Sequence, residues 1–75
     1  MKELVEIIAR ALVDNPEEVV VTETDNGQEL VLELKVAEYD MGKVIGKQGR
    51  IAKAIRSVVK AAAAKENIKV VLDIE

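Results

Sequence analysis

The sequence predicts an α+β fold whose elements follow the order α-β-β-α-α-β, with three helices packed on one face of a three-stranded mixed sheet. Three observations predict this fold. Apolar residues near the amino terminus recur at helical spacing, and two strand-like segments flank an Asp-Asn-Gly turn. A long helical segment then precedes a final segment of alternating apolar and polar residues. Helices and strands of this kind form two layers around one core.

The first helix is expected over about residues 2 to 13, and Asp14-Asn15-Pro16 should end it. A strand of β-branched residues is expected over about 19 to 24. Asp25-Asn26-Gly27 then offers the positive φ angles of a tight hairpin turn, so the second strand should follow at once. The helix stripe expected to face the core consists of Leu4, Val5, Ile7, Ile8, Ala11 and Leu12.

The second strand is expected over about 30 to 36, where apolar residues alternate with mostly polar ones. Asp40 is expected to cap a short helix that runs through Ile45, and a longer helix follows a glycine turn. Alanines 61 to 64 should extend this longer helix through their helix propensity alone. The buried stripe of the longer helix is expected to contain Ile51, Ile55, Val58, Val59 and Ala62.

Asn67 is expected to end the longer helix, and a final alternating strand covers about 68 to 74. The second and third strands are therefore joined through two helices. Such a connection is long enough for a right-handed crossover, which makes these two strands parallel neighbours. The first strand then pairs with the other side of the second strand, which gives a mixed sheet.

Composition excludes most enzymatic chemistry. Residues 1 to 75 are expected to form one small domain with no cysteine, no histidine and Ser57 as the only serine. No thiol is present, and no hydroxyl has an imidazole to activate it. We therefore expect no catalysis, no cofactor, no metal and no small-molecule substrate. No apolar run has the length of a membrane span or a signal peptide, so a cytoplasmic protein without membrane association is expected.

The motif with the clearest functional meaning is Gly46-Lys47-Gln48-Gly49, which stands at the front of the longer helix. Glycines let another backbone approach closely, and backbone N–H groups at the start of a helix can bind an anion. Charge supports this interpretation, because residues 1 to 40 carry eleven acids and three bases whereas residues 41 to 75 carry eight bases and three acids. No acid occurs from Met41 through Lys65. The positive charge is thus concentrated around the glycine loop.

Two other nucleotide-binding modes fit the sequence poorly. A P-loop requires glycines five positions apart and a hydroxyl after its lysine, but Gly42 and Gly46 are four apart and Gln48 follows Lys47. Modules that stack bases on aromatic rings need several such rings, and Tyr39 is the only aromatic residue. We expect Tyr39 to be a partly buried packing residue, with stacking on a terminal base as the alternative.

The element order, together with Ile45-Gly46-Lys47-Gln48-Gly49-Arg50-Ile51, resembles the type II KH domain over the whole chain. Within that family it is most similar to the small stand-alone bacterial KH proteins of the KhpA type, which bind RNA. The resemblance implies that the loop clamps the backbone of about four single-stranded nucleotides. It implies a shallow groove for the bases, with a floor formed by Ile45, Ile51 and part of the strand segment 69 to 72. The residues expected to contact RNA are Lys43, Ile45, Gly46, Lys47, Gln48, Gly49, Arg50 and Lys53.

Several alternatives stay open. Ile45, Ile51 and Ile55 have the spacing of ordinary core residues, and Lys60 and Lys65 are expected to be solvated, because they lie turns away from the loop. A post-transcriptional regulator or RNA chaperone is the first functional hypothesis. The alternative is a protein-interaction module that dimerises or recruits a larger RNA-binding KH protein of the Jag or KhpB type. Both a homodimer and such a heterodimer are expected from the resemblance.

Overall fold

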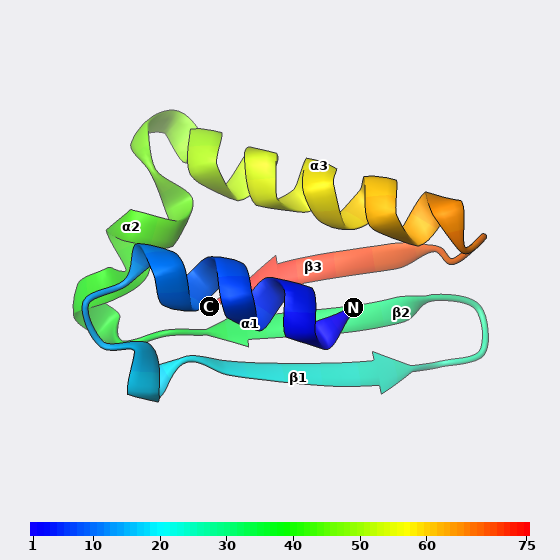
Figure 1. Ribbon diagram of the computed structural model, residues 1–75, viewed down its shortest axis with the longest axis horizontal. Coiled ribbons are helices and arrows are strands. Elements are labelled where there is room, and N and C mark those ends of the chain that lie inside the picture. The colour runs from blue at the N-terminus through cyan, green and yellow to red at the C-terminus, as the bar shows by residue number, and fades with distance from the viewer.

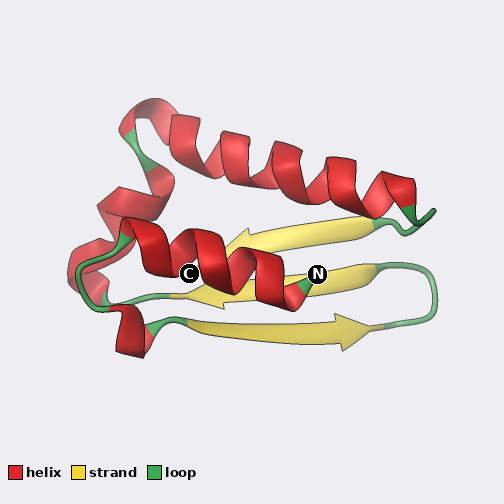
Figure 2. Ribbon diagram, viewed as in Figure 1, coloured by secondary structure: helices red, strands yellow, loops and turns green.

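The computed structural model describes all residues from 1 to 75 and has the predicted order of elements (Figure 1). Short 3₁₀ turns lie at Pro16–Glu18, Glu38–Asp40 and Lys47–Gly49. The helices and strands are α1 (Lys2–Leu12), β1 (Val20–Asp25), β2 (Leu30–Lys35), α2 (Met41–Ile45), α3 (Arg50–Lys65) and β3 (Val70–Ile74). Figure 2 shows α1 lying across the sheet and α3 running alongside β3. Burial alternates along the central strand, so one face of the sheet is covered and the other is more exposed.

The sheet is mixed, with the strand order β1-β2-β3. β1 pairs antiparallel with β2 and places Val21 opposite Leu34, whereas β3 pairs parallel with β2 and places Leu72 opposite Leu32. The predicted crossover from β2 through α2 and α3 to β3 is therefore confirmed. Both outer strands have one free edge.

The core lies between the helical layer and the inner face of the sheet. Leu32 and Leu34 on the central strand are fully buried, together with Val5 on α1, Val44 on α2 and Val59 on α3. These residues belong to one cluster of 15 buried side chains. Because α2 contributes to the same core as α3, the glycine loop between them starts and ends on anchored helices.

The buried stripes of the helices are narrower than predicted. In α1 the buried residues are Val5 and Ala9, while the predicted Ile7 is 68% exposed. Leu4 and Ile8 pack partly against the core, whereas Ala11 and Leu12 are exposed. The prediction was right at Leu4, Val5 and Ile8 and wrong at Ile7, Ala11 and Leu12. The side of α1 that faces β1, α3 and α2 is centred on the i, i+4 pair Val5 and Ala9.

The stripe of α3 is also shifted. Its buried residues are Ala52, Ile55, Val59 and Ala63, whereas Val58 is exposed and Ile51 and Ala62 are only half-buried. Small side chains at both ends of this stripe let α3 lie close to the sheet. Ala63 therefore extends the helix by packing as well as by propensity, which corrects the sequence-based interpretation.

The end of α3 is built as predicted, around Asn67 with a positive φ of 57°. The Ile68 N–H donates to the carbonyl of Ala63 at 2.9 Å, and the Asn67 N–H donates to the carbonyl of Ala64 at 3.1 Å. This pair of bonds is a Schellman motif, which turns the chain directly into β3. No helix in the structure is both long and apolar enough to cross a membrane.

Candidate nucleic-acid interface

The glycine loop joins α2 to α3, and three of its residues have positive φ. Gly46 has φ 74° and ψ 176°, Gln48 has φ 57° and ψ 25°, and Gly49 has φ 72° and ψ 17°. The Gly46 conformation is accessible essentially only to glycine. A Cβ at Gly46 would also lie 2.6 Å from Cγ1 of Ile51, whereas a Cβ at Gly49 would meet nothing within 4 Å. Gly46 is thus required by packing, and Gly49 leaves an open surface.

Two backbone amides in the middle of the loop have no partner in the protein. The Gly46 N–H donates to the Gly42 carbonyl at 2.9 Å, and the Gly49 N–H donates to the Gly46 carbonyl at 3.2 Å. The Arg50 N–H donates to the Lys47 carbonyl. The N–H groups of Lys47 and Gln48 make no such bond. They are available to an acceptor outside the protein, and successive N–H groups of this kind form concave anion sites.

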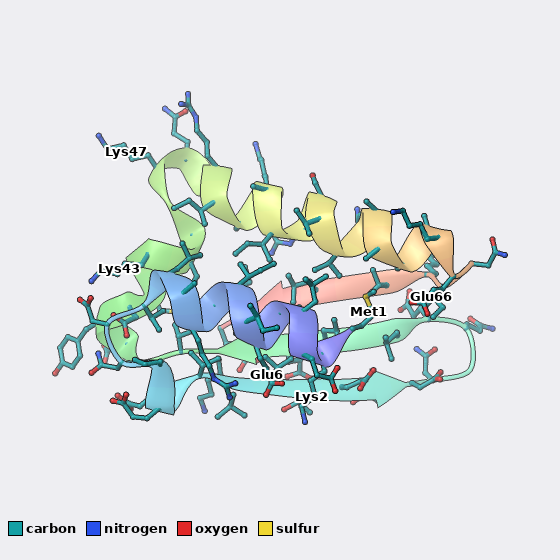
Figure 3. All side chains as sticks on the ribbon, in the orientation of Figure 1. Met1, Lys2, Glu6, Lys43, Lys47 and Glu66 are labelled. Carbon is teal, nitrogen blue, oxygen red and sulfur yellow. The ribbon has the colours of Figure 1, made fainter.

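The side chains around the loop add positive charge. Lys47, Arg50 and Lys53 are exposed, and none of them forms an ion pair. Figure 3 shows Lys47 projecting from the loop into solvent, beyond the end of α3. Gln48 is also exposed. The loop therefore combines two amide donors with three unpaired cations and a neutral hydrogen-bonding side chain.

Lys43 lies at the same end of the molecule, on α2, but its ammonium group already has a partner (Figure 3). It forms an ion pair with Asp14 and lies 3.9 Å from Oδ1 of Asp40. The hydrogen bond to Asp14 raises the pKa of Lys43, and this effect exceeds the lowering caused by burial. Of the four cations expected at the site, Lys43 is thus the only one that is neutralised within the protein.

Asp40 anchors α2 to the loop that follows α1. Its side chain is 1% exposed and accepts hydrogen bonds from Nδ2 and the N–H of Asn15, both at 3.0 Å, and from the N–H of Asp14 at 3.3 Å. Burial pushes the pKa of Asp40 upward, but the hydrogen bonds from Asn15 and Asp14 and the charge of Lys43 outweigh burial, and the net pKa is lowered. Asp40 occupies the N-cap position of α2 as predicted, but its carboxylate bonds to no N–H group of α2, so the prediction of side-chain capping was wrong.

The expected groove residues divide into two groups. Ile45 and Ile51 are half-buried and pack against the core cluster, and Ile51 also fills the space beneath Gly46. Ile55 is fully a core residue. Ile51 therefore packs directly against the glycine loop. Ile55, which was not expected in the groove floor, follows the core alternative.

The structure does contain a groove, and it runs between α3 and β3 with a volume of about 540 Å³. The strand side includes the segment 69 to 72 that the resemblance implies. The helix side consists of Arg56 and Lys60, which were not among the expected site residues. Their i, i+4 spacing within the acid-free run was the available signal, since it places both cations on one helix face.

A second depression, of about 350 Å³, lies at the β1–β2 hairpin and the turn before β3. Its charged lining residues are three acidic ones, Glu23, Asp25 and Glu29, and one basic one, Lys69. The hairpin lies at the opposite end of the molecule from the glycine loop (Figure 1). Its negative charge makes it unsuitable for a phosphate backbone.

Tyr39 does not pack as predicted. The side chain is 89% exposed, whereas Ala37 before the 3₁₀ turn and Asp40 at the end of the turn are buried. The prediction of a partly buried tyrosine was therefore wrong. The ring contributes little to the stability of the core.

Comparison with known proteins adds a family to this geometry. The family model described as "KhpA/KhpB, KH domain" matches residues 2 to 74. The protein named RNA-binding protein KhpA from Clostridium perfringens is 70% identical over 74 residues, which cover 99% of each chain. Proteins of the same name are 66% identical in Clostridium acetobutylicum, over 99% of each chain, and 50% identical in Listeria monocytogenes, over 99% of this chain and 97% of the relative. No solved structure matches the chain.

Proposed function

Because the chain belongs to the KhpA/KhpB KH-domain family, we propose that it binds single-stranded RNA and holds the phosphate backbone with its glycine loop. The observation that carries this proposal is the pair of unpartnered amides of Lys47 and Gln48, which lie between two glycines with positive φ. An RNA phosphate supplies the acceptors that these donors lack. The relatives that match the chain over nearly their whole length are themselves named RNA-binding proteins.

The binding mode follows from the arrangement around the loop. The two amides hold one phosphate, and the open side of Gly49 lets the nucleotide backbone approach closely. Lys47, Arg50 and Lys53 neutralise neighbouring phosphates and release their counterions. The bases then extend along α3 into the groove beside β3. No chemical step is involved, and the protein acts in the cytoplasm as an RNA chaperone or post-transcriptional regulator.

Affinity for a short RNA should be modest. The groove offers no aromatic ring, and stacking on aromatic rings supplies much of the affinity of other single-strand binders. Pairing two KH domains raises the effective concentration of the second site and compensates for this weakness. The partner in that arrangement is a second copy or a larger KH protein of the KhpB type, a name that the matching family model also carries.

A second candidate function is protein interaction with little RNA affinity. It is favoured by the apolar side chains that the fold leaves on its surface, among them Ile7, Val58 and Tyr39. These side chains belong to three different elements. They add nothing to RNA binding through the glycine loop.

The test is a fluorescence-anisotropy titration of short single-stranded RNA with the wild type and with Lys47→Asp/Gln48→Asp. The matched control is Lys35→Asp/Gln28→Asp, which makes the same charge change at exposed positions away from the loop. We expect the loop variant to lose binding by more than about tenfold relative to the control. The wild-type log–log salt slope should be about −2, as three phosphate contacts on a single strand predict. Circular dichroism checks that both variants are folded.

Two results would contradict the proposal. Equal loss in the loop variant and the control would mean that net charge, not the loop, determines affinity. A folded wild type that binds no RNA even at low salt would leave protein interaction as the function.

A further inference from the structure

Arg56 lines the groove and is anchored there by a single hydrogen bond. Its Nε donates a hydrogen bond to the backbone carbonyl of Leu72 at 3.1 Å. The side chain is half-buried, and its two terminal nitrogens donate no hydrogen bond and join no ion pair, although Asp73 lines the same groove. An arginine guanidinium has five N–H donors in one plane. One of them is used, and the other four have no protein partner.

The carbonyl that holds Arg56 lies on the free edge of the sheet. Leu30 donates to the carbonyl of Lys69 at 2.8 Å, and Glu75 donates to the carbonyl of Leu34 at 2.8 Å. These two bonds show that Lys69 and Glu75 direct their backbone N–H and C=O groups toward β2. Because the direction alternates along a strand, the other odd-numbered residues of β3 also face β2. The backbone groups of Val70 and Leu72 therefore face away from β2. Arg56 therefore spans from α3 to the open edge of β3. The bond to Leu72 fixes the plane of its fork against the strand.

We propose that Arg56 determines base specificity by selecting a base that presents two adjacent hydrogen-bond acceptors, guanine or cytosine, over adenine and uracil. The inference rests on the proposed function, since it assumes that the bases enter the groove beside β3. Single-stranded RNA makes such a contact feasible, because its unstacked bases expose their edges.

The selection follows from donor and acceptor patterns. Guanine presents O6 and N7 side by side, and arginine contacts them with two parallel N–H bonds. Cytosine offers O2 and N3 on its pairing edge. Adenine instead places an amino donor beside N7, and uracil places an N–H between its two carbonyls, so either base directs an N–H group at the fork. An arginine has no acceptor to receive it.

Lys60 provides the contrast within the same groove. Its ammonium group is a flexible point charge that makes no hydrogen bond to the backbone, so it attracts phosphate without distinguishing bases. Arg56 has a planar fork and an anchor, and both are needed for bidentate recognition. Discrimination should therefore depend on Arg56 and not on the total positive charge of the groove.

The experiment compares four RNA oligonucleotides that are identical except for one central base in a uridine background. Fluorescence anisotropy gives each dissociation constant for the wild type, Arg56→Lys and Lys60→Gln. For the wild type we expect guanine, cytosine or both to bind about tenfold more tightly than uracil and adenine. Arg56→Lys should remove this ratio while keeping the salt slope, whereas Lys60→Gln should weaken all four RNAs alike and keep the ratio.

A second measurement does not depend on a variant that folds. In the ¹⁵N spectrum of the wild type, the Arg56 Nε–H signal should shift on addition of the preferred RNA and stay in place with the all-uridine RNA. Comparing the guanine-containing with the cytosine-containing oligonucleotide shows which of the two bases supplies the acceptor pair. Equal affinities for all four bases, or a base preference that survives Arg56→Lys, would overturn the inference. The proposed function is tested separately. If RNA binding is sensitive to salt and is lost in Lys47→Asp/Gln48→Asp, the proposed function holds even when the inference about Arg56 fails.

Discussion

At the scale of single residues, the two loop glycines have different physical reasons to be glycine. Gly46 combines a φ and ψ pair that other residues avoid with a close contact to Ile51, and Gly49 has only a left-handed conformation. Alanine in the left-handed region costs about 1 kcal/mol, and alanine in the Gly46 region costs up to about 3 kcal/mol before any steric clash. Stability and RNA binding should therefore respond differently to changes at the two positions.

We predict that Gly46→Ala lowers the free energy of unfolding by about 3 kcal/mol, because both backbone strain and the clash with Ile51 contribute. Gly49→Ala should cost only about 1 kcal/mol. Urea denaturation monitored by circular dichroism measures both values. Asparagine tolerates left-handed φ, so Gly49→Asn serves as the control for strain at that position. Equal losses at Gly46 and Gly49 would contradict the assigned role of Ile51.

Lys43 supplies a second prediction at this scale. Under the proposed function, its ion pair with Asp14 competes with RNA. Asp14→Asn leaves the ammonium group with only the 3.9 Å contact to Asp40 and should strengthen RNA binding by about twofold to fivefold at low salt. Stability should change little, because exposed ion pairs contribute about 0 to 1 kcal/mol. Because the folded-state pKa of Lys43 is raised, the stabilisation that its charge provides is fully present below the ordinary value of 10.5. Its contribution to stability is lost only as the pH rises through the folded-state value.

A double-mutant cycle isolates this effect. Anisotropy titrations compare Asp14→Asn in the wild-type background with the same change in a Lys43→Gln background. The gain in affinity should disappear when Lys43 is absent. If Asp14→Asn still raises the RNA affinity in the Lys43→Gln background, the gain comes from removing the negative charge of Asp14 and not from releasing Lys43.

At the scale of elements, the position of the glycine loop depends on how α2 is attached to the fold. Val44 is the buried residue of this five-residue helix. Asp40, at the start of α2, accepts hydrogen bonds from the backbone of the segment that follows α1. Five residues are too few to form a stable helix alone. The loop geometry is therefore set by contacts that lie outside the motif.

Asp40 makes α2 sensitive to acid. Because its folded-state pKa is lowered, its hydrogen bonds stabilise the fold above the ordinary aspartate value of 3.8, and this contribution is lost as the pH falls through the folded-state value. We predict that Asp40→Asn destabilises the protein at neutral pH and flattens the dependence of stability on pH below 3.8. Thermal unfolding measured between pH 2 and pH 7 checks this. If the variant loses stability below pH 3.8 as steeply as the wild type does, the sensitivity to acid comes from other carboxylates.

The sequence predicts the elements better than it predicts their contacts. Hydrophobic periodicity and turn residues gave the order, the crossover and the ends of α3, because these depend on local chemistry. Which side of α1 faces the core depends on the neighbours of α1, so Ile7 was placed wrongly. The glycine loop was found from its motif, but the bonds of Asp40 to Asn15 and of Arg56 to Leu72 join residues 25 and 16 positions apart. No local pattern predicts such pairs.

At the scale of the whole molecule, charge is separated along the fold. The acid-free segment forms α2, the loop and all of α3, whereas acids concentrate in the amino-terminal half that includes β1 and the hairpin. The loop and the hairpin lie at opposite ends of a molecule about 34 Å long (Figure 1). The net charge of −3 thus conceals a basic end around the glycine loop and an acidic end, whose field repels a phosphate backbone.

Salt should decide whether the acidic end affects RNA binding. Glu23→Gln/Asp25→Asn removes two hairpin charges while keeping the side-chain acceptor that Asp25 offers to the Gly27 N–H. The Debye length is about 8 Å at physiological salt and about 30 Å at 0.01 M. We therefore predict less than about a twofold change in RNA affinity at physiological salt, and a clear gain at 0.01 M. Anisotropy titrations at both salt concentrations measure this. A large gain at physiological salt would mean that RNA contacts the hairpin directly, and the path from the loop along α3 would then have to continue to the end of the sheet.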